Sequence, residues 1–185
     1  MSRGDEFQER DIISLLIQYG GQSLPGLETT VAEYILADLE ESLNSFDNPL
    51  YGKIAKTCHS ILVEKQPLTQ DYFLHHEVKE IRDLAVDILS ESTQWNYSPN
   101  WEAKGLPLQN QPMPDQNFDR QTYRAINLFK IRKLGKMLEM NHVRIKQAED
   151  SDDLETKKRY IQVDMKIRKT RNDIAKQWGI VILPW

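Results

Sequence analysis

The sequence predicts an all-α protein, built from a small helical bundle and a long helical hairpin. Apolar residues recur every three or four positions along most of the chain, and no segment keeps the alternation of a half-buried strand. The last third holds two long, basic stretches separated by the acidic turn 149–153. We therefore expect a bundle of about five helices over 7–90, an extended connector over 91–118 and an antiparallel hairpin over 119–185.

The first two helices of the bundle have clear boundary signals. A broad apolar face over 7–19 predicts the first helix, which the pair Gly20 and Gly21 ends. Thr30 followed by Glu33 is a capping box that opens the second helix, and its apolar face predicts an end near Asn44.

Three further helices complete the predicted bundle. Asn48 before Pro49 is an N-cap with proline at the first helical position, and the apolar stripe continues to about Lys65. Thr69 can cap a short fourth helix. A fifth follows from the apolar spacing of Val78, Ile81, Leu84, Ala85, Ile88 and Leu89.

The connector 91–118 is rich in proline and aromatic residues. Four of the eight prolines of the chain lie there, together with Trp95, Tyr97 and Trp101. Proline favours extended backbone, whereas large aromatic side chains are costly to leave in water. We expect this segment to pack on the bundle as a strap.

The predicted hairpin begins with a helix over 119–147, roughly 45 Å long at 1.5 Å per residue. Its first half is apolar nearly all round, which indicates an end embedded in the bundle. Asp152, with Glu155 three residues later, is the predicted cap of the last helix. The two helices are expected to pack along seams formed by Ile131, Leu134, Leu138, Asn141 and Ile145, and by Tyr160, Val163, Ile167, Ile174 and Trp178.

Several classes of function lack support in the sequence. The apolar runs are too short to span a membrane, and the first residues lack the apolar stretch of a secretory signal, so we expect a cytoplasmic protein. Cys58 is the sole cysteine, on a predicted core face. His75 and His76 are adjacent on a predicted helix and diverge by about 100°, which disfavours a shared metal ion. We predict no catalytic residue, metal, cofactor or small-molecule substrate.

The distal hairpin carries more apolar residues than one two-helix seam needs. These residues either thicken the seam or remain exposed to a partner, and the second reading is favoured because a two-helix projection has little interior. Neighbouring cations would steer docking onto an acidic surface. The candidate partner-binding residues are Met137, Met140, Val143, Arg144, Lys157, Lys158, Tyr160, Ile161 and Met165.

Charge divides the chain unevenly. Residues 1–115 contain 8 basic and 19 acidic residues, whereas 116–185 contain 16 basic and 9 acidic residues. The basic part could lie along the phosphates of a nucleic acid, or it could be the solvated face of two exposed helices. Binding to nucleic acid is therefore a secondary prediction.

Two short strings and the terminal helix pair suggest a family. Residues 9–20, Glu-Arg-Asp-Ile-Ile-Ser-Leu-Leu-Ile-Gln-Tyr-Gly, and residues 46–51, Phe-Asp-Asn-Pro-Leu-Tyr, followed by the long hairpin, resemble the C-terminal helicase-binding region of bacterial DnaG-type DNA primases. The resemblance implies a helical bundle followed by a long helix and a C-terminal helical hairpin. The connector 91–118 is longer than that pattern.

The resemblance also implies a function. The hairpin would dock primase onto the N-terminal domains of the hexameric replicative DNA helicase, and the bundle would modulate the helicase during primer synthesis. This chain has no counterpart of the zinc-binding and polymerase regions, so it would be non-catalytic. Two alternatives remain: the N-terminal domain of a replicative helicase, which has a similar helical fold, or a helical adaptor that binds nucleic acid through the basic hairpin.

Overall fold

A computed structural model describes residues 6–93 and 117–182. The described residues form α-helices and one 3-10 helix, which confirms the predicted all-α class. They divide into two compact units, 1–123 and 124–185, which we call the body and the arm. Most of the predicted strap, including Trp95, Tyr97 and Trp101, lies outside the described residues.

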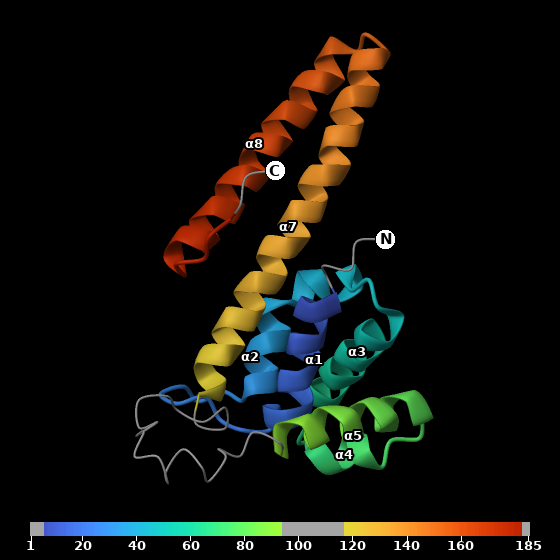
Figure 1. Cartoon of the computed structure of the whole chain (residues 1–185), viewed down its shortest axis with the longest axis vertical. Helices are drawn as coiled ribbons and strands as arrows, with labels where there is room; N and C mark the ends of the chain where they lie inside the picture. Colours follow the sequence, from blue (N-terminus) through green and yellow to red (C-terminus); the bar gives the residue numbers. More distant parts are fainter. Residues whose placement is uncertain (1–5, 94–116, 183–185) are drawn as a thin grey trace, which may run out of the picture. The chain divides into compact units, whose positions relative to one another are not determined.

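Within its described residues, the body contains five complete α-helices, one 3-10 helix and the beginning of a further α-helix (Figure 1). Helix α1 packs against α2, α3, α4 and α5 and is the central element of this unit. The elements are α1 (Glu6–Tyr19), α2 (Val31–Asp38), the 3-10 helix η1 (Glu40–Ser45), α3 (Pro49–Val63), α4 (Gln70–Leu74), α5 (Lys79–Thr93) and the first turns of α7 (Phe118–Asp150).

The predicted helix starts in the body are confirmed. The Thr30 side chain accepts from the backbone N–H of Glu33, and the Glu33 carboxylate accepts from the backbone N–H of Thr30 at 2.7 Å. Asn48 Oδ1 accepts from Leu50 N at 2.9 Å, ahead of Pro49. Such bonds satisfy amides that have no partner within the helix.

The end of the second helix differs from the prediction. Helix α2 ends at Asp38, and η1 replaces the expected α-helical continuation toward Asn44. The Ser42 amide donates to Leu39 O, the three-residue spacing of a 3-10 helix. Leu39 remains buried, so the apolar pattern is kept although the helix type changes.

The body core is apolar and tightly closed. Ile13, Ile35, Ile54, Cys58 and Ile88 are all less than 1% exposed. Gly20 allows the chain to leave α1 close to its neighbours, because a Cβ there would lie 2.3 Å from Leu16 O. The cysteine is buried, as predicted, and burial raises the pKa of its thiol to about 12.

One buried carboxylate joins two distant parts of the body. Glu9 is only 1% exposed, and its two oxygens accept from the backbone amides of Asp47 at 2.7 Å and Asn48 at 2.9 Å. These residues belong to the two strings on which the family resemblance depends. Their joint occurrence therefore has a structural explanation, because Glu9 fixes the loop that begins α3.

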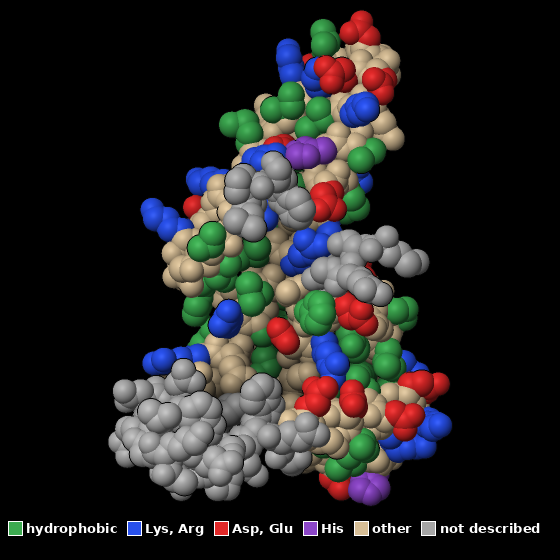
Figure 2. Space-filling model, viewed as in Figure 1, with side chains coloured by type: hydrophobic (Ala, Val, Ile, Leu, Met, Phe, Trp, Pro, Cys, Tyr) green, Lys and Arg blue, Asp and Glu red, His purple; other side chains and the backbone are tan. Residues whose placement is uncertain are grey.

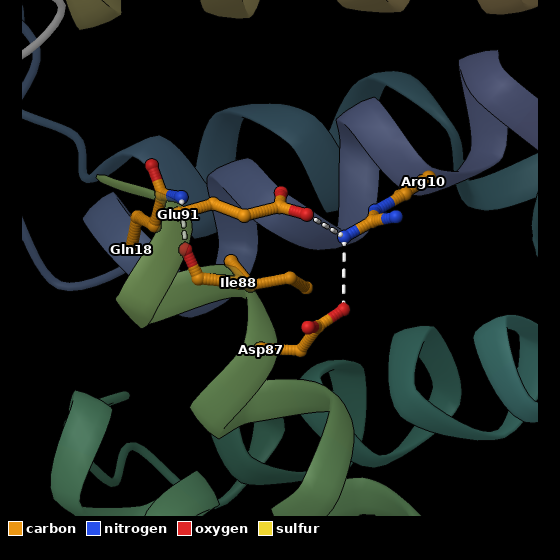
Figure 3. Close-up of polar contacts among 5 residues, drawn as sticks. All are labelled: Arg10, Gln18, Asp87, Ile88 and Glu91. Atoms are coloured by element: carbon orange, nitrogen blue, oxygen red, sulfur yellow. Dashed lines mark hydrogen bonds and ion pairs between the residues drawn. The ribbon is translucent and has the colours of Figure 1, made fainter. Parts of the chain in front are cut away.

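A polar clamp also holds α1 against α5 (Figure 3). Arg10 Nη2 lies 2.8 Å from Glu91 Oε1 and 3.2 Å from Asp87 Oδ2, and Gln18 Nε2 donates to Ile88 O. The Arg10 side chain is 34% exposed and both carboxylates are more exposed, so solvent screens the ion pairs. The clamp orients α5 and contributes modestly to stability.

The first turns of α7 are anchored in the body, as the sequence predicts. Phe118 stacks on Tyr19 with ring centroids 5.4 Å apart, and Tyr123 meets Tyr34 edge to face at 5.2 Å. Thr122 is fully buried and donates its hydroxyl to Phe118 O. A continuous helix thus leaves the body and enters the arm.

Charge follows the division into two units. The body, residues 1–123, contains 9 basic and 20 acidic residues, and the arm, 124–185, contains 15 basic and 8 acidic residues. Figure 2 shows Asp and Glu side chains spread over the visible face of the body. Among the described helices, none has an apolar stretch long enough to cross a lipid bilayer.

Candidate functional site

The arm is an antiparallel helical pair whose seam contains polar residues. Helix α8 (Leu154–Gln177) returns along α7 after a short turn (Figure 1). Asn141 is 4% exposed, and its Nδ2 donates to the backbone carbonyl of Tyr160 at 2.8 Å. A buried amide that bonds to one carbonyl of the facing helix specifies the register of the two helices.

A second polar contact crosses the seam one turn farther along α8. Asp164 Oδ2 accepts from Arg168 Nε at 2.6 Å, and its Oδ1 lies 2.9 Å from His142 Nε2. The Asp164 side chain is 14% exposed, compared with 52% for His142. The mostly buried Asp164 carboxylate thus contacts His142 of α7 and pairs with Arg168 of its own helix.

Arginine also enters the arm's interior. Arg171 is 9% exposed, although it carries a full charge. Burial is the main cause that lowers the pKa of Arg171; the nearby cations Arg168 and Arg132 lower it further, while Glu139 opposes them. Burying charge opposes folding, so the arm's interior is less stabilising than an apolar seam.

The predicted seam agrees better with the structure on α7 than on α8. On α7, Ile131, Leu138 and Asn141 are buried, while Leu134 and Ile145 are half-buried. On α8, Ile167 is buried, but Val163 and Trp178 are each 43% exposed. The seam instead includes Asp164, Arg171 and Ala175.

Apolar side chains are exposed on the outside of the same arm. The five apolar residues proposed from the sequence are 41% to 66% exposed: Met137, Met140, Val143, Ile161 and Met165. Of the other candidates, Arg144 and Lys158 are exposed, while Lys157 and Tyr160 are half-buried. Lys157 Nζ pairs with Glu149 Oε1 at 2.7 Å, and the backbone carbonyl of Tyr160 is the acceptor for Asn141.

The candidate residues occupy two opposite flanks of the arm. On α8, Ile161 lies four residues after Lys157 and seven before Arg168, so the three side chains share one side of the helix. Lys157 contacts Glu149 and Arg168 contacts His142, which places Ile161 on the same side of the arm as these two contacts. Met137 lies five residues before His142, about 140° round α7, and thus on the other side. We call these the α8 flank, formed by Leu154, Lys158, Ile161 and Met165, and the α7 flank, formed by Met137, Met140 and Arg144.

Sequence reasoning missed two exposed apolar residues. Leu154 is 64% exposed at the first turn of α8, seven residues before Ile161, and this spacing could have identified it. Val163 was assigned to the seam, although its neighbour Asp164 occupies that position. Helix α8 has two apolar stripes with the same three- and four-residue spacing, and this spacing alone does not show which stripe faces α7.

The turn between the helices is acidic, and one of its carboxylates caps α8. The cap is Asp153, whose Oδ1 accepts from Thr156 N at 3.0 Å, and the prediction of Asp152 is wrong by one residue. Asp152 has a φ of 55° and reverses the chain. The hydrogen bond from the Thr156 amide lowers the pKa of Asp153, and the hydrogen bond from Lys157 lowers the pKa of Glu149.

A histidine pair and a surface hollow lie elsewhere in the described chain. His75 lies beside Asp71 on the surface, while His76 Nδ1 accepts from Val78 N, so the two rings have separate roles. Within the described residues, no group of three His, Cys, Asp or Glu is arranged to hold a metal ion. A hollow of about 490 Å³ is lined by Leu43, Asn44, Phe46, Pro49, Gly52, Lys53, Lys56, Thr57 and Ser60, without an acid–base pair.

Comparison with known proteins gives a family without a functional description. Neither the curated proteins nor the solved structures include a match to this chain. The family model described as a domain of unknown function, DUF8430, matches residues 1–181, and the chain belongs to that family.

Proposed function

We propose that this chain is a non-catalytic protein-interaction module and that the arm is its partner-binding element. The observation that carries the proposal is the distribution of apolar side chains in the arm. Seven large apolar residues between 137 and 165 are at least 41% exposed: Met137, Met140, Val143, Leu154, Ile161, Val163 and Met165. Exposed apolar side chains at this density are typical of a surface that another protein covers.

Electrostatics indicates the character of the partner. The arm has 15 basic and 8 acidic residues, and Arg144 and Lys158 stand beside exposed apolar side chains. An acidic protein surface with apolar pockets would complement this pattern, with apolar anchors supplying most of the affinity and cations accelerating encounter.

The partner that the primase-like strings suggest is the N-terminal domain of the replicative DNA helicase. In that role the module would recruit primase to the replication fork. The identity of this partner rests on the resemblance alone, since the family comparison supplies no function. The interaction role itself depends only on the arm.

Calorimetric titration of the full chain against the helicase N-terminal domain from the same organism tests both statements. Binding at micromolar or tighter affinity is expected. Replacing Met137 and Met140 with serine should weaken it at least about tenfold, as loss of buried apolar anchors does. Val86→Ser is the matched control, because Val86 is 51% exposed in the body.

The outcomes separate the two levels of the proposal. No binding by the wild-type chain would exclude this helicase as the partner. Equal affinities of the arm variant and the control would show that the α7 flank is not the contact surface.

A second candidate function follows from the arm's net charge of +7, that is 15 basic minus 8 acidic residues. A phosphate-binding adaptor would bind DNA with an affinity that falls steeply as salt increases. The acidic turn 149–153 would repel the phosphates of a nucleic acid, and the exposed apolar side chains would gain nothing from contact with them. DNA binding that is strong, salt-dependent and insensitive to the methionine variants would favour this alternative.

A further inference from the structure

The α8 flank has the spacing of a helix-pairing surface. Leu154, Lys158, Ile161 and Met165 follow one another at intervals of four, three and four residues, as along a coiled-coil seam. The three apolar members are 64%, 41% and 66% exposed. Helix α8 thus has a second, unoccupied stripe beside the one that faces α7.

The acidic turn stands out on an otherwise basic arm. The turn segment 149–155 contains five acidic residues and no basic one. Near the other end, 130–136 contains four basic residues, and 171–177 adds two basic residues and one acidic residue. These two segments lie level with each other, since the contact of His142 with Asp164, continued along the antiparallel helices, sets 130–135 opposite 171–176. One end therefore carries a charge of −5 and the other of +5.

This arrangement is complementary to itself in antiparallel orientation. The acidic turn lies about 16 Å from the middle of the Ile161–Met165 stripe at 1.5 Å per residue, and the basic segment lies a similar distance on the other side. A two-fold overlap centred on this stripe would place the acidic turn of each copy beside the basic segment of the other. Figure 2 shows acidic side chains at the turn end of the arm, among Lys, Arg and hydrophobic side chains.

We propose that the α8 flank binds a second copy of this chain, so that two arms associate antiparallel as a four-helix bundle. The two-fold axis would bring Ile161 of each copy close to Met165 of the other. A closed pair of this kind buries the same stripe on both copies and leaves no open edge. The α7 flank faces away and stays available to another protein.

Two exposed substitutions test the apolar contact in the full chain. Analytical ultracentrifugation of the wild type should show a monomer–dimer equilibrium that weakens with salt. Ile161→Ser with Met165→Ser should raise the dimer dissociation constant at least about tenfold. Met137→Ser with Val163→Ser, which changes exposed residues on the other flank, should leave it unchanged. Circular dichroism checks that all variants keep their helix content.

Charge reversal gives an independent test of the antiparallel arrangement. Glu149→Lys, Asp150→Lys and Glu155→Lys change the charge of the turn segment from −5 to +1, and Lys133→Glu, Lys136→Glu and Lys176→Glu change that of the opposite segments from +5 to −1. Each variant alone should lose the dimer, because both contacts of a homodimer become repulsive. An equal mixture should recover it, since each reversed segment then meets its complement.

Three results would overturn the inference: a wild type that stays monomeric at every concentration, a dimer that survives the Ile161 and Met165 changes, or a mixture that fails to associate. The inference rests on the proposed function only in treating the arm as a contact surface. A monomer that still binds the helicase domain would contradict the homodimer and leave the proposed partner standing. A dimer that does not bind that domain would contradict the proposed partner and leave the homodimer standing.

Discussion

The body and the arm use apolar residues in opposite ways. In the body, residues such as Ile13 and Ile54 are fully buried, and the one buried carboxylate described there, Glu9, accepts two backbone hydrogen bonds. In the arm, Asn141, Asp164 and Arg171 occupy interior positions, while Met165 is 66% exposed. The body's pattern is accounted for by its own folding. The arm's pattern is the one expected of the proposed contact surface, which another molecule would cover.

The largest expected effect contrasts one substitution at two sites. Ile54→Ala removes a fully buried side chain from the body core and should lower the unfolding free energy by about 2–5 kcal/mol, through lost burial and a residual cavity. Ile161→Ala, at a residue 41% exposed on the arm, should change it by less than about 0.5 kcal/mol. Urea denaturation of both variants, at a protein concentration low enough for the chain to be monomeric, gives the comparison. Similar losses would mean that the arm buries Ile161 as the body buries Ile54.

A buried and an exposed glutamate on α1 give a second comparison, with a smaller expected effect on stability. Glu9→Gln replaces one carboxylate oxygen with an amide donor that faces a backbone N–H, so one of the two amides of Asp47 and Asn48 loses its acceptor. Such a loss in a buried site should cost about 1–3 kcal/mol. Glu6→Gln is the control, because Glu6 is exposed on the same helix. Equal midpoints for the two variants would contradict the role assigned to Glu9.

A feature could be predicted from the sequence where the interacting residues are close together in the chain, and not where they are far apart. The capping residues Thr30 and Asn48 act within a few residues, and their bonds agree with the pattern. Glu9 bonds to amides 38 and 39 residues away, which no local signal reveals. On α8 the two apolar stripes are equivalent by period, and the sequence places Val163 inside. In the structure Asp164 occupies the interior position instead, because an ion pair and not an apolar contact fills it.

The closed core of the body should also appear in the dependence of stability on pH. Burial raises the pKa of the Cys58 thiol from 9.0 to about 12 in the folded chain. Above pH 9 the unfolded chain releases this proton while the folded chain keeps it, so stability falls as pH rises between these values. The loss attributable to Cys58 at pH 10 should be about 1.4 kcal/mol.

A paired variant isolates the cysteine's contribution. Cys58→Ala should lower stability at pH 8 through its cavity but should lose less on going from pH 8 to pH 10 than the wild type does. Thiol labelling supplies a second readout. Cys58 should react only on unfolding, whereas a cysteine introduced by Met165→Cys in the Cys58→Ala background should react at once. Rapid labelling of native Cys58 at pH 8 would contradict a closed core.

A further small effect on stability is expected in the arm, at a residue that sets the register of its two helices. Asn141→Leu exchanges the buried amide for an apolar side chain of similar size, which should change the unfolding free energy by less than about 1 kcal/mol. The bond to the Tyr160 carbonyl is lost, so nothing polar at that level then opposes sliding of α8 along α7. Backbone amide NMR signals from 154–165 should broaden or double, while those of the body stay sharp. A single sharp set of arm signals would assign the register instead to His142, which contacts Asp164 and Arg168 of α8. The double substitution Asn141→Leu with His142→Ala would then be the variant that loses the register.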